Sequence, residues 1–320
     1  MDETLMYLAS QQHGVVTRAQ ALAAGLDDGE ISRRVQGGRW TTVRRGAYVE
    51  SEQWAAMDDL ARHRVLSQAV VLQLTKPVVL CHVSAAVVAG LRVWDVDLSK
   101  VHVWRSDLRS PRVEGGVHHH TGALDESDVI EIDGLPVTGF ARTAVDVART
   151  AGFESAVVTA DHALARLGTT NEALRTVLDT MRDWRGARAA GRVVEFADPR
   201  SESVGESRHR VQLERIGLPR PELQVGMPGP DGATDRVDFY FADQATVGEF
   251  DGRQKYERLL RPGETAEDAI WREKVREDRL RERGLQVVRT VWADLYRDDA
   301  VASRYLSAFA RNRRRHVVVA

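Results

Sequence analysis

The first fifty residues restrict the fold most strongly, because three short amphipathic segments separated by glycine turns lead into an alternating pattern. Apolar residues at helical spacing predict three helices, over residues 3–12, 18–24 and 28–36. Thr17 and Asp27 stand where N-caps are expected, and Gly25 and Gly37 stand where the second and third helices end. We therefore expect a compact first domain over residues 1–52.

A short hairpin is predicted directly after the third helix, since Trp40, Val43, Gly46 and Tyr48 follow an alternating pattern. Three helices, a short turn and a β-wing together indicate a winged helix-turn-helix, which places its third helix in the major groove of DNA. The side chains expected to contact DNA are on the third helix and around the wing: Ser32, Arg33, Arg34, Arg39, Arg44 and Arg45.

The composition is that of a folded globular protein, with 43% hydrophobic and 29% charged residues and a net charge of −2. Contact with nucleic acid must therefore depend on local basic patches rather than on overall charge. The absence of a long apolar run and of a basic leader predicts a cytoplasmic protein. A single cysteine, Cys81, excludes an intrachain disulfide and a cysteine-based zinc cluster, so a bound metal would need oxygen or histidine ligands.

Residues 53–197 are predicted to form a mostly helical middle domain with a small β insert. Helices are expected over 55–74, 82–90, 142–150, 153–166, 170–180 and 186–197, and strands over 101–104, 116–119, 129–132 and 135–137. The run His118-His119-His120 suggests a metal site, but adjacent residues of a strand point to opposite faces. Since three consecutive histidines cannot converge on one ion, the sequence favours a structural role for them.

Residues 198–312 have a different pattern, with residues 313–320 expected as a tail. The predicted elements are a helix over 202–216, strands over 222–225, 237–241 and 245–250, a helix over 266–283, a strand over 285–290 and a helix from about 293. A turn is expected over residues 228–232. This order, α-β-β-β-α-β-α, predicts a mixed sheet flanked by helices. The whole chain is thus expected to be an α+β protein of several domains.

Carboxylates gather on these predicted strands. Asp238 lies on one strand and Glu249 on the next, and Asp251 shares a strand face with Glu249. Glu202 and Glu206 lie four residues apart and therefore on one face of a helix. Several converging carboxylates would need a cation, and oxygen ligands suit Mg²⁺ or Mn²⁺. Solvent-facing strand ends and a salt-bridged helix would explain the same spacing equally well.

Two resemblances add to this interpretation. The segment Asp238-Phe239 … Glu249-Phe250-Asp251-Gly252-Arg253-Gln254-Lys255-Tyr256 resembles the Asp…Glu-x-Asp-Gly-x-x-His-Tyr core of the very-short-patch-repair-like branch of the PD-(D/E)XK nuclease superfamily, whose fold is restriction-endonuclease-like. At the other end, Gly14-Val15-Val16-Thr17 and Arg45-Gly46-Ala47-Tyr48 are similar to the AbiEi-type antitoxin winged helix. The segments 82–86 and 139–143 resemble the domain that follows this winged helix in such antitoxins. The whole chain thus resembles actinobacterial proteins that join an AbiEi-like N-terminal part to a nuclease-like C-terminal part.

The nuclease resemblance implies roles for particular residues. Asp238 and Glu249 would be ligands of Mg²⁺ or Mn²⁺, and Glu206, with Glu202 as the alternative, would be the acidic residue of the first helix. Two positions depart from the pattern: Asp251 stands where the superfamily has lysine, and Lys255 stands where this branch has histidine. Lys255 would supply the missing cation, with Lys274 as another candidate. The catalytic set implied is Glu206, Asp238, Glu249, Asp251 and Lys255.

The sequence therefore supports two functions. The first is a DNA endonuclease that hydrolyses phosphodiester bonds with Mg²⁺ or Mn²⁺ and is directed by its winged helix. The second, implied by the AbiEi resemblance, is an antitoxin that represses its own transcription, opposes a toxin encoded nearby and carries an inactive nuclease-like domain. A winged helix that binds protein instead of DNA is a third alternative. Paired half-sites on DNA would be consistent with a homodimer.

Overall fold

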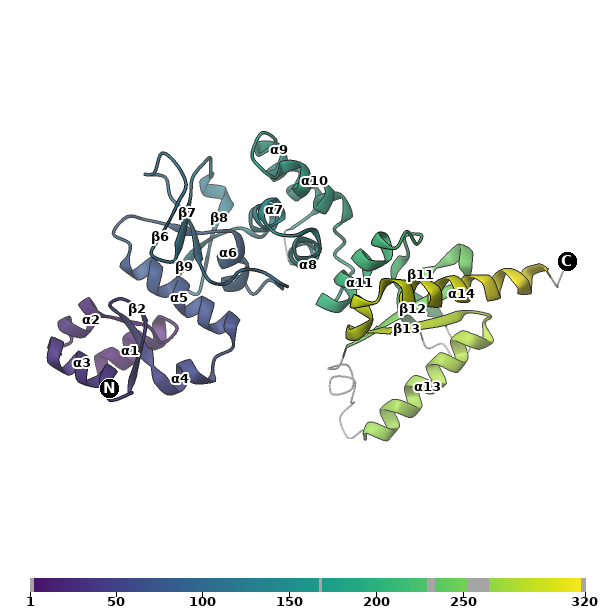
Figure 1. Ribbon diagram of the computed structural model, residues 1–320, viewed down its shortest axis with the longest axis horizontal. Helices are drawn as coiled ribbons and strands as arrows, with labels where there is room; N and C mark the ends of the chain where they lie inside the picture. Colours follow the sequence, from purple (N-terminus) through teal and green to yellow (C-terminus); the bar gives the residue numbers. More distant parts are fainter. Residues whose placement is uncertain (1–2, 167–168, 229–233, 253–264, 318–320) are drawn as a thin grey trace. The chain divides into compact units, whose positions relative to one another are not determined.

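A computed structural model of the protein describes residues 3–166, 169–228, 234–252 and 265–317, without the side chains of residues 266, 269, 270 and 312–317. The chain divides into two compact units, residues 1–197 and 198–320, and each is a separate body (Figure 1). Residues 1–52 and 53–197, which the sequence assigns to two domains, fall within the first unit.

The first unit begins with three helices and a small sheet in the order predicted. Its elements are α1 (Glu3–Gln11), β1 (Val16–Thr17), α2 (Arg18–Ala23), α3 (Asp28–Gln36), β2 (Trp40–Arg44) and β3 (Ala47–Glu50), with strand order β1-β3-β2. Both predicted N-caps are confirmed: the Thr17 side chain accepts a hydrogen bond from the backbone N–H of Gln20, and the Asp27 side chain accepts one from Glu30. Leu5, Ile31 and Trp40 belong to the buried core that joins the helices to the sheet.

Two helices connect this module to the rest of the unit, α4 (Ser51–Ala56) and α5 (Asp59–Gln73). The single helix expected over 55–74 is wrong, because the Asp58 side chain caps α5 by accepting a hydrogen bond from the backbone N–H of Ala61 (2.8 Å). Val65 and Ala69 of α5 share a buried cluster with strand β3. The winged module and α5 therefore have part of their core in common.

The remainder of the unit contains a six-stranded mixed sheet. Its strands are β4 (Val79–Leu80), β5 (Val101–Trp104), β6 (Arg112–Glu114), β7 (Val117–His120), β8 (Val129–Ile132) and β9 (Leu135–Thr138), in the order β6-β7-β5-β4-β9-β8. The expected small β insert is thus larger than predicted. Strand β4 is only two residues long and β6 is exposed throughout, so neither shows the alternation that marks a half-buried strand.

Five more helices belong to this unit; the first packs on the sheet, and the others pack mainly on one another (Figure 1). They are α6 (His82–Val88), α7 (Phe140–Thr150), α8 (Phe153–Leu164), α9 (Asn171–Thr180) and α10 (Ala187–Phe196). Helix α7 carries a buried ionic triad, in which the Asp146 carboxylate pairs with Arg142 and Arg149 at 3.1 Å each. All three side chains are at most 11% exposed, and Arg142 also pairs with Asp128 (3.3 Å), so the charges are compensated within the protein.

The second unit has the predicted element order. It contains α11 (Val204–Arg215), β10 (Glu222–Pro228), β11 (Thr234–Phe241), β12 (Thr246–Asp251), α13 (Ala266–Glu282), β13 (Gln286–Val291) and α14 (Asp298–Val317), with short 3-10 turns over 242–244 and 292–296. The sheet order is β10-β11-β12-β13, antiparallel except for the parallel pair β12–β13. Helix α13 covers one face of the sheet, and α11 and α14 cover the other (Figure 1).

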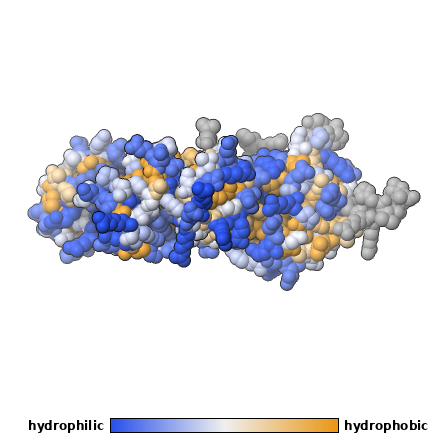
Figure 2. Space-filling view, turned by 90° about the horizontal axis from the view of Figure 1, so that it is seen from above, coloured by the Kyte–Doolittle hydropathy of each residue, from blue (hydrophilic) through white to orange (hydrophobic). Residues whose placement is uncertain are grey.

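Two details at the end of the chain differ from the sequence prediction. The last helix begins at Asp298 rather than near Ala293, and it continues to Val317, so the tail expected from residue 313 is wrong over these residues. In the described part of the chain, no helix is long and apolar enough to cross a membrane. On the face shown in Figure 2, hydrophilic and apolar residues are interspersed.

Candidate nucleic-acid interface and carboxylate cluster

Helix α3 is the element that a winged helix would place in the major groove. Ile31 on its inner face is 3% exposed and packs in the core, whereas Ser32 and Arg33 are exposed. Gly29 and Gln36 are exposed as well, and their spacing of four and three residues from Arg33 puts them on the same helix face. The sequence interpretation missed these two, although this spacing was sufficient to find them.

Arg34 does not lie on that exposed face, so the expectation that it is available to DNA is wrong. Its side chain is 16% exposed, forms an ion pair with Glu30 (3.1 Å) and covers the Trp40 ring, with its guanidinium carbon 4.9 Å from the ring centroid. Since Arg34 follows the buried Ile31 by three residues, helical periodicity brings it to the edge of the buried face. It serves to attach α3 to strand β2.

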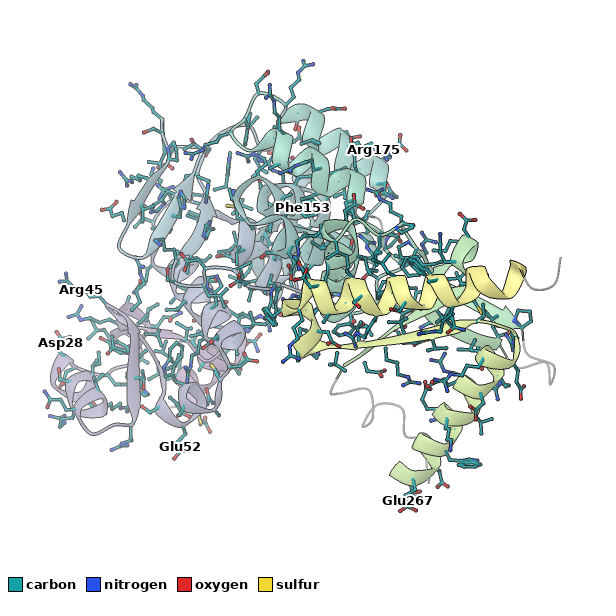
Figure 3. All side chains as sticks on the ribbon, turned by 45° about the vertical axis from the view of Figure 1, so that its right-hand side comes forward. Asp28, Arg45, Glu52, Phe153, Arg175 and Glu267 are labelled. Carbon is teal, nitrogen blue, oxygen red and sulfur yellow. The ribbon has the colours of Figure 1, made fainter. Side chains whose placement is uncertain are left out.

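The two arginines of the wing, Arg44 and Arg45, differ in exposure and in contacts. Arg45, at the turn between β2 and β3, is exposed and extends away from the protein (Figure 3). Arg44 is instead held within the unit, because it donates to the Gln73 side chain (Nε···Oε1 2.8 Å) and to the carbonyl of Gly115 (Nη1···O 2.6 Å). A DNA contact by Arg44 would require it to leave these partners and stays a prediction, whereas Arg39, after α3, is exposed.

The first turn of α3 is acidic, with Asp28 and Glu30 following the cap. Acidic residues stabilise this end of a helix, but they repel phosphate. Arg18 compensates in part, since its guanidinium forms two hydrogen bonds with the Asp28 carboxylate (2.8 and 2.6 Å). Phosphate contacts therefore suit Arg33, Arg39 and Arg45 better than the beginning of the helix.

In the second unit, the two predicted metal ligands lie on neighbouring strands. Phe239 of β11 pairs with Gly248 of β12, so the antiparallel register puts Asp238 opposite Glu249. Both are buried, at 8% and 2% exposure. The Asp238 carboxylate accepts a hydrogen bond from the backbone N–H of Phe250 (Oδ2···N 2.9 Å).

A guanidinium from helix α13 reaches the Glu249 carboxylate. Arg276 pairs with Glu249 (Nη2···Oε1 2.9 Å) and with Glu273 (Nε···Oε2 3.0 Å). Burial alone would lower the pKa of Arg276, but the facing carboxylates of Glu249 and Glu273 outweigh it and raise that pKa. Arg276 therefore stays charged and occupies one side of the position that a metal ion would need.

The other predicted residues of this site are also bound within the protein. Asp251 pairs with Arg289 (3.1 Å), which in addition contacts Glu273 and Glu277. The Glu206 carboxylate accepts hydrogen bonds from the Ser203 hydroxyl, the backbone N–H of Glu202 and the Gln224 side chain, at 2.7–2.9 Å. Lys255, with the rest of its segment, lies outside the described residues.

This arrangement does not fit a divalent ion directly. Within the described residues, no three of these carboxylates bring their oxygen atoms within 4.8 Å of one another. Glu249 would have to leave Arg276 before it could bind a metal together with Asp238. Mg²⁺ or Mn²⁺ at Asp238 and Glu249 therefore stays a prediction, and so do the catalytic roles of Glu206 and Asp251.

Comparison with known proteins finds a family match at the beginning of the chain. Residues 3–51, which contain α1, α3 and the wing, match the family described as transcriptional regulator, AbiEi antitoxin. This match supports a DNA-binding regulatory role and agrees with the resemblance seen in the sequence. The matches found do not support nuclease activity or a very-short-patch-repair-like domain.

Two curated relatives cover a longer part of the chain. They are uncharacterized protein MT2308 of Mycobacterium tuberculosis strain CDC 1551 / Oshkosh and uncharacterized protein Rv2248 of strain H37Rv. Each is 33% identical over 188 residues, which make up 59% of this chain and 65% of the relative. The crystal structure of the Rv2827c protein from the same species matches at 17% identity and a TM-score of 0.40, over 71% of this chain and 87% of that one.

Proposed function

We propose that this protein is a transcriptional regulator of the AbiEi antitoxin type that binds DNA through α3 and its wing. The observation that carries the proposal is the exposed face of α3, with Gly29, Ser32, Arg33 and Gln36, inside the segment that matches the antitoxin family. The small Gly29 allows close approach, and the polar side chains can hydrogen-bond base edges in the major groove.

Basic residues on either side of this face supply the contacts to phosphate. Arg39 follows α3, and Arg45 stands at the wing tip, so together with Arg33 they form a positively charged rim. Such contacts release counterions from DNA and make binding depend on salt. They fix the position of the protein on the duplex, while the α3 face reads the sequence.

The test is binding of the full-length protein to DNA from upstream of its own gene, measured by fluorescence anisotropy at several salt concentrations. Replacing Arg33 and Arg45 by alanine should weaken binding at least tenfold, since one arginine bound to DNA contributes roughly 1–3 kcal/mol. The dependence of affinity on salt should also become weaker, by about one unit of log–log slope for each arginine that no longer neutralises a phosphate.

The matched control removes two arginines elsewhere in the same unit, Arg175 on helix α9 and Arg188 on helix α10, which are both exposed. Arg175 is labelled in Figure 3. The net charge changes by the same amount, so an effect of overall charge would appear in both variants. Equal affinity of the Arg33/Arg45 variant and the wild type would refute α3 and the wing as the DNA-binding surface.

Two finer features belong to the same proposal. The antitoxin family implies a toxin partner, and we propose that the partner is encoded beside this gene and binds the protein. We also propose that a homodimer reads an inverted repeat, since winged helices commonly use two half-sites. Mass measurement of the DNA complex should give two chains per inverted repeat, and one chain per repeat would contradict the dimer.

Mg²⁺-dependent DNA cleavage is the second candidate, favoured by the facing positions of Asp238 and Glu249 on β11 and β12. We expect wild-type protein to leave a plasmid intact in Mg²⁺ or Mn²⁺, because Arg276 holds the Glu249 carboxylate. The control repeats the assay with the variants Asp238→Asn and Glu249→Gln, each of which removes one of the two candidate metal ligands. Cleavage by the wild type that disappears in both variants would establish the nuclease instead.

A further inference from the structure

A group of histidines lies on the six-stranded sheet of the first unit, apart from the α3 and wing surface and from the carboxylate cluster. His102 belongs to β5, and His118 and His120 belong to β7, which pairs with β5 in parallel. His102 is directly beside His118, and His120 is two residues further along the same strand. Alternation places all three side chains on one face of the sheet, and His119 on the other.

The three imidazoles are close enough to share a ligand. One nitrogen from each lies within 4.8 Å of the others. His102 Nδ1 is 2.9 Å from His120 Nε2, and the rings of His118 and His120 stack with centroids 4.0 Å apart. Three consecutive histidines of one strand still cannot converge on an ion, but two of them join a third from the neighbouring strand, which the sequence interpretation overlooked.

Two further side chains of types that can bind a metal, His82 and Cys81, lie next to this triad. The His82 ring stacks on His120 with centroids 3.8 Å apart, and His82 Nδ1 is 3.2 Å from the sulfur of Cys81. His82 has a φ of +52°, in the left-handed region that residues other than glycine rarely adopt. Such backbone conformations are concentrated at functional sites, where the surrounding structure maintains them.

Charged side chains lie on both sides of the histidine cluster. Cys81, His82 and His120 line a pocket together with the ionic triad of Arg142, Asp146 and Arg149, whose net charge is positive. His102 and His118 are away from that pocket wall and have Lys100 as a cationic neighbour.

We propose that His102, His118 and His120 bind one divalent transition-metal ion of the zinc type. Imidazole nitrogen is a preferred ligand of Zn²⁺, and three histidines with one position left open form a known type of zinc coordination. Zinc–nitrogen bonds of about 2.0–2.1 Å require the nitrogen atoms to approach one another more closely than 4.8 Å. Rotation of half-buried side chains provides that change, and His82 is the nearest additional ligand.

The test titrates purified full-length protein with Zn²⁺ in competition with a chromogenic chelator. One equivalent of Zn²⁺ should bind, and affinity should fall at least tenfold in His118→Ala and in His102→Ala. The matched control is His119→Gln, which changes the residue between two ligands but on the opposite face of β7. Circular dichroism of each metal-free variant checks that it is folded.

Cobalt substitution provides a second measurement that identifies the ligands. The proposal predicts the visible bands of four-coordinate Co²⁺ without a thiolate charge-transfer band, and Cys81→Ser should leave the spectrum unchanged. A thiolate band that disappears in Cys81→Ser would overturn this assignment and indicate instead a site formed by Cys81, His82 and His120. The absence of Zn²⁺ binding, or equal loss of affinity in the His119→Gln and His118→Ala variants, would overturn the metal site itself. Neither outcome depends on whether the protein binds DNA.

Discussion

Replacing Asp146 by alanine is expected to destabilise the first unit by about 3–5 kcal/mol, the range typical for removing one partner of a buried ion pair. Asp146 is 1% exposed and lies between Arg142 and Arg149, whose side chains are 5% and 11% exposed. Without the carboxylate, two buried guanidiniums would face each other without this charge partner. Burial raises the pKa of Asp146 against the opposing effect of the arginines, so the triad is costly to bury even when complete.

Hydrogen–deuterium exchange of helix α7 measures this effect within its own unit. The control is Asp183→Ala, since the Asp183 side chain is 95% exposed and lies 4.0 Å from Arg182. An exposed pair of this kind contributes little, so exchange in α7 should be unchanged. If α7 in Asp146→Ala loses no more protection from exchange than it does in this control, the buried triad is not required for stability.

Mild acid is expected to destabilise the second unit through His209. This residue is buried between Gln212, which accepts from its Nδ1 (3.0 Å), and the Tyr305 hydroxyl, 3.0 Å from Nε2. Burial lowers its pKa to about 4, although the hydrogen bond to Gln212 acts in the opposite direction. Since the folded pKa is below the unfolded value, the unfolded chain takes up the proton first. Stability is complete above about pH 6.5 and decreases as the pH falls towards 4.

The contribution of His209 between about pH 7 and pH 5 should be about 2 kcal/mol, from a shift of this size. Hydrogen–deuterium exchange of α11 and α14, corrected for the intrinsic effect of pH, measures it. The His209→Gln variant should lack this part of the pH response, whatever its stability at neutral pH. His162→Gln, in the first unit, is the control and should retain the response in α11. An identical response in wild type and His209→Gln would contradict the prediction.

Local patterns predicted most elements correctly because the signals for them are local. Thr17 and Asp27 act within three residues of themselves, and the alternation in β5 reflects one buried face. The element order of the second unit could be predicted for the same reason. Strands β4 and β6 could not, because a two-residue strand and a fully exposed one have no periodic pattern.

The side-chain roles were harder to predict, since they depend on partners that are distant in sequence. Arg44 is attached to Gln73 and Gly115, and Glu249 to Arg276, over separations of about 30 to 70 residues. Spacing within a segment contains no information about such partners. The histidine cluster illustrates the same limit, because only the pairing of β5 with β7 brings His102 to His118.

The two hydrogen bonds of Arg44 have a mechanical consequence. One bond holds the α5 side chain of Gln73, and the other holds the carbonyl of Gly115, two residues before β7 begins. The hairpin that follows α3 and the strand that carries His118 are therefore fastened to a common point. Arg44 is the last residue of β2, so these bonds hold the tip of the hairpin, and a ligand that displaces β7 also displaces that tip while they persist.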